Sequence, residues 1–221
     1  MLSRTNFAGT RKVASGPSSP SKPKTFESAI KAISVPVEYD RNGEIYAEGD
    51  SAENLYQVIS GTVRSYRLLD DGRRQIGAFY FSGDIFGLEV GSEHTFAAEA
   101  IVDSRILVIR RSALADLAAR DNSVARKLWT LSATEVHRAQ SHATALIMNA
   151  QERVIGFLHE MVKRSPTAAE IELPMSRGDI ADYLGLTIET VSRTLKQLER
   201  SASIALPTSR HIVMRDHATL G

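Results

Sequence analysis

The stretch GDIADYLGLTIETVSRTLKQLER, residues 178–200, has the apolar spacing of two short helices interrupted by one glycine. Ser176 is a suitable N-cap for the first helix, and Asp179 follows three places later, as in a capping box. Gly185 falls where the first helix must stop and the chain must turn with positive φ. Thr187 then caps the second helix. These offsets are typical of a helix-turn-helix and are more specific than a generic helical hairpin.

The apolar residues of this stretch divide each helix into an inner and an outer side. Their spacing by three and four places predicts that one side is buried. The predicted inner side consists of Ile180, Ala181, Leu184, Leu186, Val191, Leu195 and Leu198.

The outer side of the second helix carries Glu189, Ser192 and Arg193. In a helix-turn-helix, the N-terminal part of the second helix enters the major groove of DNA. There a glutamate can accept a hydrogen bond from cytosine N4, an arginine can donate twice to guanine, and a serine can bond to base edges. These three residues are therefore the predicted base contacts. The alternative is a surface ion pair between Glu189 and Arg193, four places apart.

Other polar residues suit contacts to the phosphate backbone, which position a protein without reading sequence. The whole chain has a net charge of only +1, but residues 190–215 carry five cations against one acid, Glu199. A local basic surface is the usual footprint of phosphate contact, although a solvated charged face would give the same pattern. The predicted phosphate contacts are Thr187, Thr190, Lys196, Arg200 and Arg210.

The composition and periodicity of the residues along the chain predict an α+β protein with four segments. Residues 1–24 are rich in Ser, Pro and Lys and indicate a disordered basic arm. Residues 25–120 begin with a short helix over 26–33 and then alternate short β-rich runs with glycines, which favours a jelly-roll-like β-roll. Residues 121–150 predict a long helix. Residues 151–221 predict a winged helix-turn-helix domain with a terminal hairpin.

Two details of the β-rich segment carry this interpretation. The run ENLYQVISGTVRSYRLLDDGRRQIGAFYF, residues 53–81, indicates three strands, the last two joined by an Asp-Asp-Gly turn. The run HTFAAEAIVDSRILVIRR, residues 94–111, indicates two more strands. The DDGRR turn at 70–74 could contact RNA polymerase or be a simple hairpin.

The long helix carries small and apolar residues at alternating steps of three and four places. This stripe persists for three heptads, and its alanines allow a close approach by another helix. We therefore predict a dimerisation helix, with packing on the chain's own β domain as the alternative. The predicted interface comprises Trp129, Ser132, Val136, Ala139, Ala143, Leu146 and Ala150.

Composition excludes several other classes of protein. There are no cysteines, so disulfides, thiolate zinc sites and cysteine-held iron–sulfur clusters are excluded. No apolar run is long enough to cross a bilayer, and the N-terminus lacks a secretory signal, so we expect a cytoplasmic protein without a membrane partner. No nucleophile motif, P-loop or dinucleotide-binding fingerprint indicates an enzyme. The six histidines do not occur at metal-ligand spacing, and we expect no cofactor and no metal. Haem ligation by His94 is conceivable, but an isolated loop histidine is more often exposed.

Four stretches resemble the cyclic-AMP-receptor and fumarate–nitrate-reduction regulator superfamily of bacterial transcription factors, over roughly residues 28–216. They are EIYAEGDSAENLYQVISGTVR, FSGDIFGLE, QERVIGFLHEM and, most specifically, SRGDIADYLGLTIETVSRTLKQLE. The pattern E-x-x-S-R from Glu189 to Arg193 resembles the oxygen-regulator branch and not the cyclic-AMP branch. Within that branch, the chain resembles the FixK-type regulators of nitrogen fixation and microoxic respiration. The resemblance implies a homodimer that reads a palindrome of TTGA-type half-sites, with Glu189 and Arg193 on the central C·G and G·C pairs. It also implies activation by recruitment of RNA polymerase.

The sequence departs from a cyclic-AMP binder where the phosphate would lie. Leu88 follows Gly87 where a glutamate is expected, and the expected arginine region, residues 94–100, contains no basic residue except His94. A phosphodiester would lack its counter-charge there. We therefore expect regulation without a cyclic nucleotide or an iron–sulfur cluster. Two alternatives stay open: a regulator whose β-roll binds an effector such as a cyclic nucleotide or haem, and a dimer that acts by protein contact without DNA.

Overall fold

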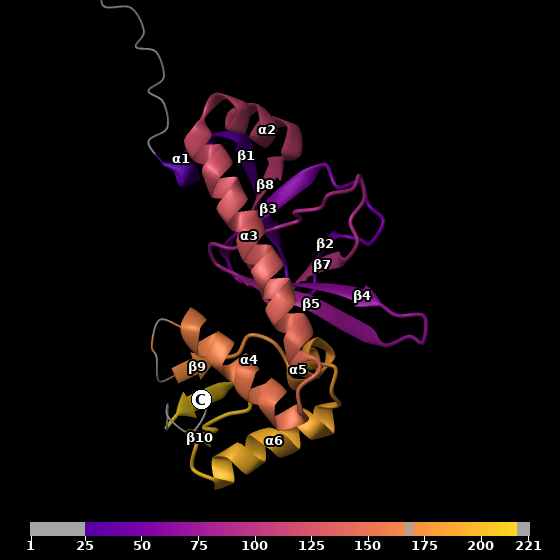
Figure 1. The fold of residues 1–221 in the computed structure, drawn as a ribbon, viewed down its shortest axis with the longest axis vertical. Helices are drawn as coiled ribbons and strands as arrows, with labels where there is room; N and C mark the ends of the chain where they lie inside the picture. The colour runs from indigo at the N-terminus through magenta and orange to yellow at the C-terminus, as the bar shows by residue number, and fades with distance from the viewer. Residues whose placement is uncertain (1–24, 166, 168–169, 216–221) are drawn as a thin grey trace, which may run out of the picture.

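A computed structural model describes residues 25–165, 167 and 170–215 of the chain. The predicted basic arm, residues 1–24, lies outside the described residues, as does the C-terminal end of the last segment. The described chain forms a β-roll and a smaller helical domain joined by one long helix, which runs along the long axis of the molecule (Figure 1). The fold class is the predicted one.

The β-roll begins with the short helix α1 (Phe26–Ile33), which has the predicted bounds. Two four-stranded antiparallel sheets follow, with strand orders β1-β8-β3-β6 and β2-β7-β4-β5. Their strands are β1 (Ser34–Tyr39), β2 (Glu44–Tyr46), β3 (Asn54–Ser60), β4 (Thr62–Leu68), β5 (Arg74–Phe81), β6 (Ile85–Phe86), β7 (Ala97–Ala100) and β8 (Ser104–Arg110). Both quoted β-rich runs therefore form the strands predicted for them.

The turn between β3 and β4 requires its glycine. Gly61 has φ +92°, and a Cβ at this position would collide with the hydroxyl and backbone of Ser104 on β8. The Ser104 hydroxyl instead accepts a hydrogen bond from the backbone nitrogen of Thr62 at 3.1 Å. Close packing of the two sheets thus depends on the absence of a side chain at this point.

Helix α2 (Arg111–Arg120) leads into the long helix α3 (Asn122–Ala145). The prediction of one helix over 121–150 is wrong at its C-terminal end, because residues 146–149 form a turn and α4 (Ala150–Arg164) starts a new helix. The physical reason is a capping box: the Asn149 side chain accepts from Glu152 N at 3.0 Å, and the Glu152 carboxylate accepts from Asn149 N at 3.0 Å. Ala150 consequently opens α4 and is not part of α3.

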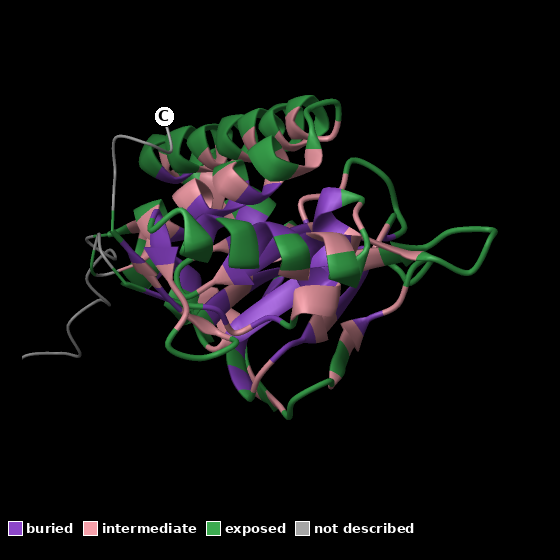
Figure 2. Ribbon diagram, turned by 90° about the horizontal axis from the view of Figure 1, so that it is seen from below, coloured by how far each residue is buried: buried purple, intermediate pink, exposed green. Residues whose placement is uncertain are grey.

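The remaining elements form the C-terminal domain. They are β9 (Glu170–Glu172), α5 (Arg177–Leu184), α6 (Ile188–Arg200), β10 (Ile204–Ala205) and β11 (His211–Met214). The three strands form a small antiparallel sheet of order β10-β11-β9. Burial coloured on the ribbon shows buried segments gathered in the interior and exposed residues on the outer faces of the helices (Figure 2). Within the described residues, no helix combines the length and the apolar character needed to cross a bilayer.

Candidate DNA-binding surface

Local hydrogen bonds build the helix-turn-helix as its sequence predicts. The Ser176 hydroxyl accepts from Asp179 N at 3.1 Å, and the Asp179 carboxylate accepts from Ser176 N at 2.9 Å, which completes the capping box of α5. Gly185 ends α5 in the left-handed region, with φ +62° and ψ 41°. The Thr187 hydroxyl accepts from Thr190 N at 3.2 Å and caps α6. The turn between the helices is therefore fixed by its own residues.

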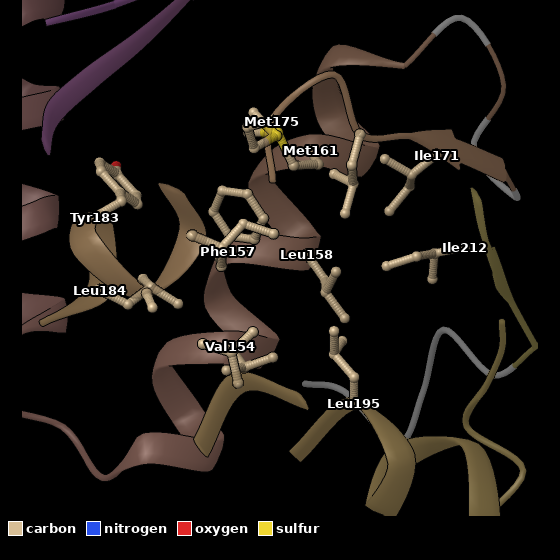
Figure 3. Close-up of a cluster of buried hydrophobic side chains, with 14 of the residues drawn as sticks. Val154, Phe157, Leu158, Met161, Ile171, Met175, Tyr183, Leu184, Leu195 and Ile212 are labelled. Carbon is tan, nitrogen blue, oxygen red and sulfur yellow. The ribbon is translucent and has the colours of Figure 1, made fainter. Parts of the chain in front are cut away.

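A shared hydrophobic core holds the two helices against the rest of the domain. The predicted inner residues of α5 and α6 are buried, except Leu186, which is half-buried against the same cluster. Figure 3 shows Leu184 and Leu195 converging with side chains of α4 and with Ile171 and Ile212 of the small sheet. The core thus orients the outer side of α6 toward solvent.

The predicted base contacts Glu189 and Arg193 are both exposed on that outer side. Hydrogen bonds from its own backbone N–H and from the Thr187 side chain lower the pKa of Glu189, so the carboxylate is charged at neutral pH. Among the described residues, the Arg193 guanidinium reaches only the Thr190 hydroxyl, at 3.4 Å. Both charged groups are therefore available to a ligand.

Ser192 lies deeper than the other two. It is half-buried, and its hydroxyl accepts a hydrogen bond from Nη1 of Arg177 at 3.3 Å. The Nε atom of Arg177 is buried and has no hydrogen-bond partner within the described residues. A contact from Ser192 to DNA would therefore use the hydroxyl proton or the one acceptor lone pair that this interaction leaves free.

One partly exposed residue of α6 was missed by the sequence analysis. Ile188, the first residue of α6, is 52% exposed beside Glu189. An exposed isoleucine at the end of a helix that enters the major groove can contact the methyl group of thymine. Ile188 continues the 3–4 spacing of Val191, Leu195 and Leu198, so nothing in the sequence indicated that its side chain is largely exposed.

The predicted phosphate contacts lie along α6, at its N-cap and in the small sheet. Lys196 and Arg200 are exposed on α6, and Thr187 is exposed at its N-cap. Thr190 is half-buried, as is Arg210 in the β10–β11 hairpin, where its backbone carbonyl accepts from Leu173 N at 2.9 Å. The small sheet thus carries Arg210 in the hairpin that follows α6, which is the position of a wing.

Helix α3 has two distinct sides. Val124, Leu128 and Leu131 pack inward on the cluster that includes Ile30 and Ile109. The predicted dimer stripe lies on another side, and its members Trp129, Ser132, Val136, Ala139 and Ala143 are exposed, Trp129 to 79% and Val136 to 57%. Leu146 and Ala150, beyond the end of α3, are half-buried. Packing on the chain's own domain therefore does not cover the α3 part of the stripe.

The interior of the β-roll is filled by aromatic rings. The rings of Tyr56 and Tyr80 each stack on Phe86, with centroids 5.2 and 4.9 Å apart. The expectation of an exposed His94 is wrong, because its ring stacks on Tyr46 at 3.6 Å and the residue is only 2% exposed. Burial lowers the pKa of His94, despite the Glu89 carboxylate 3.6 Å from Nδ1, so the ring is neutral at pH 7.

These elements together define a DNA-binding transcription regulator, with a winged helix-turn-helix that presents a charged helix and a β-roll that carries no catalytic motif. Residues 152–221 match the family model of the Crp-like helix-turn-helix domain, and residues 36–121 match that of the cyclic nucleotide-binding domain. The chain is 47% identical over 197 residues to the nitrogen fixation regulation protein FixK of Azorhizobium caulinodans, with 86% of this chain and 79% of the relative covered.

Two further comparisons agree. FixK of Rhizobium meliloti is 43% identical over 182 residues, which cover 81% of this chain and 83% of the relative. The solved structure of FixK2 from Bradyrhizobium japonicum matches with a TM-score of 0.81 and 49% identity, covering 85% of this chain and 96% of the other. The chain therefore belongs to the cyclic-AMP-receptor and fumarate–nitrate-reduction regulator superfamily, in its FixK branch, as its sequence motifs indicated. It is a transcription regulator and not an enzyme.

Proposed function

We propose that the chain acts as a homodimer that reads a palindrome of TTGA-type half-sites in double-stranded DNA. The observation that carries the proposal is the outer side of α6, where Glu189 and Arg193 are exposed, charged and free of a mutual ion pair among the described contacts. Glu189 accepts from cytosine N4 and Arg193 donates to guanine O6 and N7. Ser192 assists them.

Ile188 adds a contact to the methyl group of thymine in the same half-site. Its exposure at the start of α6 supports this role. Replacing that thymine by uracil, which lacks the methyl group, should weaken binding of the unaltered chain and leave an Ile188→Ala variant nearly unaffected. The phosphate contacts are Thr187, Thr190, Lys196, Arg200 and Arg210, which hold α6 in register without reading bases.

The dimer forms through the exposed stripe of α3. Trp129 and Val136 leave an apolar surface that pairing with a second α3 would bury, and Ala139 and Ala143 permit a close approach. Two α6 helices then lie about 34 Å apart, one turn of DNA. This arrangement accounts for a palindromic target.

The β-roll works without a cyclic nucleotide, haem or cluster. Aromatic side chains pack its interior, and Arg111 donates to the backbone carbonyls of Ala52, Glu89 and Gly91 and is therefore committed to the fold. The Glu89 carboxylate would oppose a phosphodiester. The bound dimer activates transcription by direct contact with RNA polymerase, and its target genes include those of nitrogen fixation. A DNA target implies action in the cytoplasm.

Fluorescence anisotropy tests the proposal with a TTGA palindrome and a scrambled duplex of equal length, in a series of salt concentrations. We expect much tighter binding to the palindrome, with a steep salt dependence from phosphate contacts. Cyclic AMP should leave the affinity unchanged. Equal affinity for both duplexes would refute sequence reading, and a response to cyclic AMP would refute regulation without an effector.

A further inference from the structure

The C-terminal domain is seated on the β-roll and does not hang from α3 alone. Helix α5 packs against β5, and Ile76, Phe79 and Ile101 of the β-roll belong to the same hydrophobic cluster as the core of the C-terminal domain. The ring centroids of Phe79 and Tyr183 lie 5.2 Å apart. Figure 1 shows α5 beside the base of the β4–β5 hairpin.

A buried ion cluster lies at the centre of this contact. The Asp179 carboxylate, on a residue that is 4% exposed, accepts from Nη1 of Arg64 at 2.8 Å and from Nη2 of Arg74 at 2.6 Å. Arg64, itself only 8% exposed, also donates to Glu99 at 2.9 Å. Arg74 donates through Nε to Asp182 at 2.9 Å. Two arginines of the β-roll thus hold two aspartates of the first helix of the helix-turn-helix.

Every acceptor position of Asp179 is used. Its second carboxylate oxygen accepts from the backbone N and the hydroxyl of Ser176, at 2.9 and 2.8 Å. Burial alone would raise the pKa of Asp179, but the Ser176 hydrogen bonds and the charges of Arg64 and Arg74 outweigh it and lower the pKa. Rotating the C-terminal domain would separate the Asp179 carboxylate from Arg64 and Arg74. Charges left without partners in a contact that stays buried are strongly unfavourable.

The opposite edge of the contact carries a second ionic link. Arg164 on α4 donates to Asp84 at 2.8 Å, and its guanidinium lies 5.1 Å from the centroid of the Phe81 ring. Next to Arg74, Gln75 donates to the carbonyl of Tyr183 at 3.4 Å. The two domains are therefore fixed at two separated points, which opposes rotation about either one.

The linker between the domains, residues 146–149, is hydrogen-bonded to the C-terminal domain. Arg153 donates to the carbonyl of Met148 in the turn and to that of Leu184 at the end of α5. A pivot would therefore lie at the C-terminal end of α3. Motion about it is opposed by the contacts with the β-roll and by the stacking of His142, on α3, against Tyr183.

We infer that Asp179 is a positioning residue: by binding Arg64 and Arg74 it fixes α5, and through α5 the recognition helix α6, relative to the dimer helix α3. The inference rests on the proposed function. In a dimer, this orientation sets the separation and rotation of the two α6 helices. Asp179 therefore selects the spacing between half-sites, while Glu189 and Arg193 select their sequence.

The test separates spacing from sequence. Anisotropy is measured on a series of palindromes whose half-sites are moved apart or together by one and two base pairs. Each added base pair rotates one half-site by about 35° relative to the other. A second series keeps the best spacing and changes the C·G and G·C pairs. Thermal unfolding of each variant is followed in parallel.

Variants are made on both sides of the contact. Arg74→Gln and the double variant Arg64→Gln with Arg74→Gln alter only the β-roll and leave the capping box of α5 intact. Asp179→Asn alters the C-terminal domain. The matched controls are Arg67→Gln, on β4 in a surface pair with Glu48, and Asp71→Asn, in a surface pair with Arg73.

For Arg74→Gln, and more strongly for the double variant and Asp179→Asn, we expect the affinity ratio between the best spacing and its neighbours to fall at least about fivefold. Discrimination among half-site sequences should stay within about twofold of the unaltered chain, because α6 keeps its own core. The controls should retain the original spacing profile.

An unchanged spacing profile in the folded arginine variants would overturn the inference. A parallel loss of spacing and sequence preference would also overturn it, because it would indicate a merely structural role. If Asp179→Asn fails to fold, the arginine variants alone test the inference. If the unaltered chain prefers no palindrome over random DNA, the proposed function itself is wrong, and that outcome is visible before any variant is made.

Discussion

Helices α3 and α6 are both buried along one side, but their exposed sides carry different kinds of residue. Each buries one stripe at steps of three and four residues and leaves another stripe exposed. On α3 the exposed stripe is apolar or small, and Trp129 and Val136 are its large members. On α6 it is charged, with Glu189 and Arg193 at its centre.

The difference shows what each helix requires from a partner. An exposed apolar stripe gains free energy only when another apolar surface covers it, so α3 suits a second copy of the chain. An exposed carboxylate beside a guanidinium gains specificity only from partners with matching donors and acceptors, so α6 suits base edges. The buried stripe of each helix contacts the chain's own core, and the exposed stripe limits the kind of partner that the helix can bind.

The largest expected effect comes from placing a charge on the apolar stripe of α3. Val136→Glu should abolish dimerisation and weaken binding to the palindrome at least about a hundredfold, because linked half-sites typically gain 10²–10⁴ in affinity. Sedimentation velocity and anisotropy measure the two effects. Thr134→Glu is the control, since Thr134 is exposed on another side of α3 and its hydroxyl donates to the Thr130 carbonyl of the same helix. A Val136→Glu dimer with unchanged affinity would contradict the assignment of the stripe.

Removal of a base contact on α6 should have a smaller and more selective effect. Arg193→Ala should cost about 1–3 kcal/mol on the specific palindrome and relax the preference for its G·C pair. Anisotropy with all four base pairs at that position provides the measurement, and Arg200→Ala, expected to leave the preference intact, is the control. Equal weakening on every sequence would show that Arg193 contacts phosphate.

Removal of a phosphate contact on the same helix should change affinity but not preference. Lys196→Ala should weaken specific and random DNA alike and reduce the slope of log affinity against log salt by about 1. Titrations at several salt concentrations measure this slope. A selective loss on the palindrome alone would move Lys196 into the group of base contacts.

The smallest expected effect concerns the inner side of α3 and appears in the pH dependence of stability. His142 stacks on Tyr183 with centroids 4.2 Å apart, and burial lowers its pKa below the usual 6.5. Below pH 6.5 the unfolded chain takes up a proton that the folded chain does not, so the stability this neutral ring contributes is lost as pH falls through the folded pKa.

His142→Phe keeps an aromatic ring and removes the proton site. Its free energy of unfolding should therefore fall less than that of the unaltered chain between pH 7 and pH 5, by about 1 kcal/mol for each unit of difference between the folded and unfolded pKa. Denaturant unfolding at each pH measures the change. His137→Phe, at an exposed position of α3, is the matched control. Identical slopes for His142→Phe and the unaltered chain would refute the role of His142.

Sequence reasoning was most accurate where structure depends on neighbouring residues. The capping box of Ser176 and Asp179, the left-handed Gly185 and the Thr187 cap all form within three residues of one another or within one turn. The bounds of α1 and the strand pairs around Gly61 and Gly72 followed from the same kind of local signal. The capping box of Asn149 and Glu152 was equally local, and it was overlooked in predicting one helix over 121–150.

Other features depend on residues that the sequence does not bring together. The burial of His94 under Tyr46 and the bond from Arg177 to Ser192 follow from packing between elements. The local sequence predicts the place of Asp179 in the capping box of Ser176, but not its ion pair with Arg64, 115 positions away.

The sequence by itself thus determined the helix-turn-helix, the β-roll and the family, because caps, glycines and apolar spacing act over a few residues, and it predicted the side chains for the proposed DNA contact. Only the tertiary structure decided which of those side chains are free, which face of α3 is left uncovered and how the C-terminal domain is held on the β-roll. These are properties of contacts between distant segments, whose geometry depends on the packing of the whole chain.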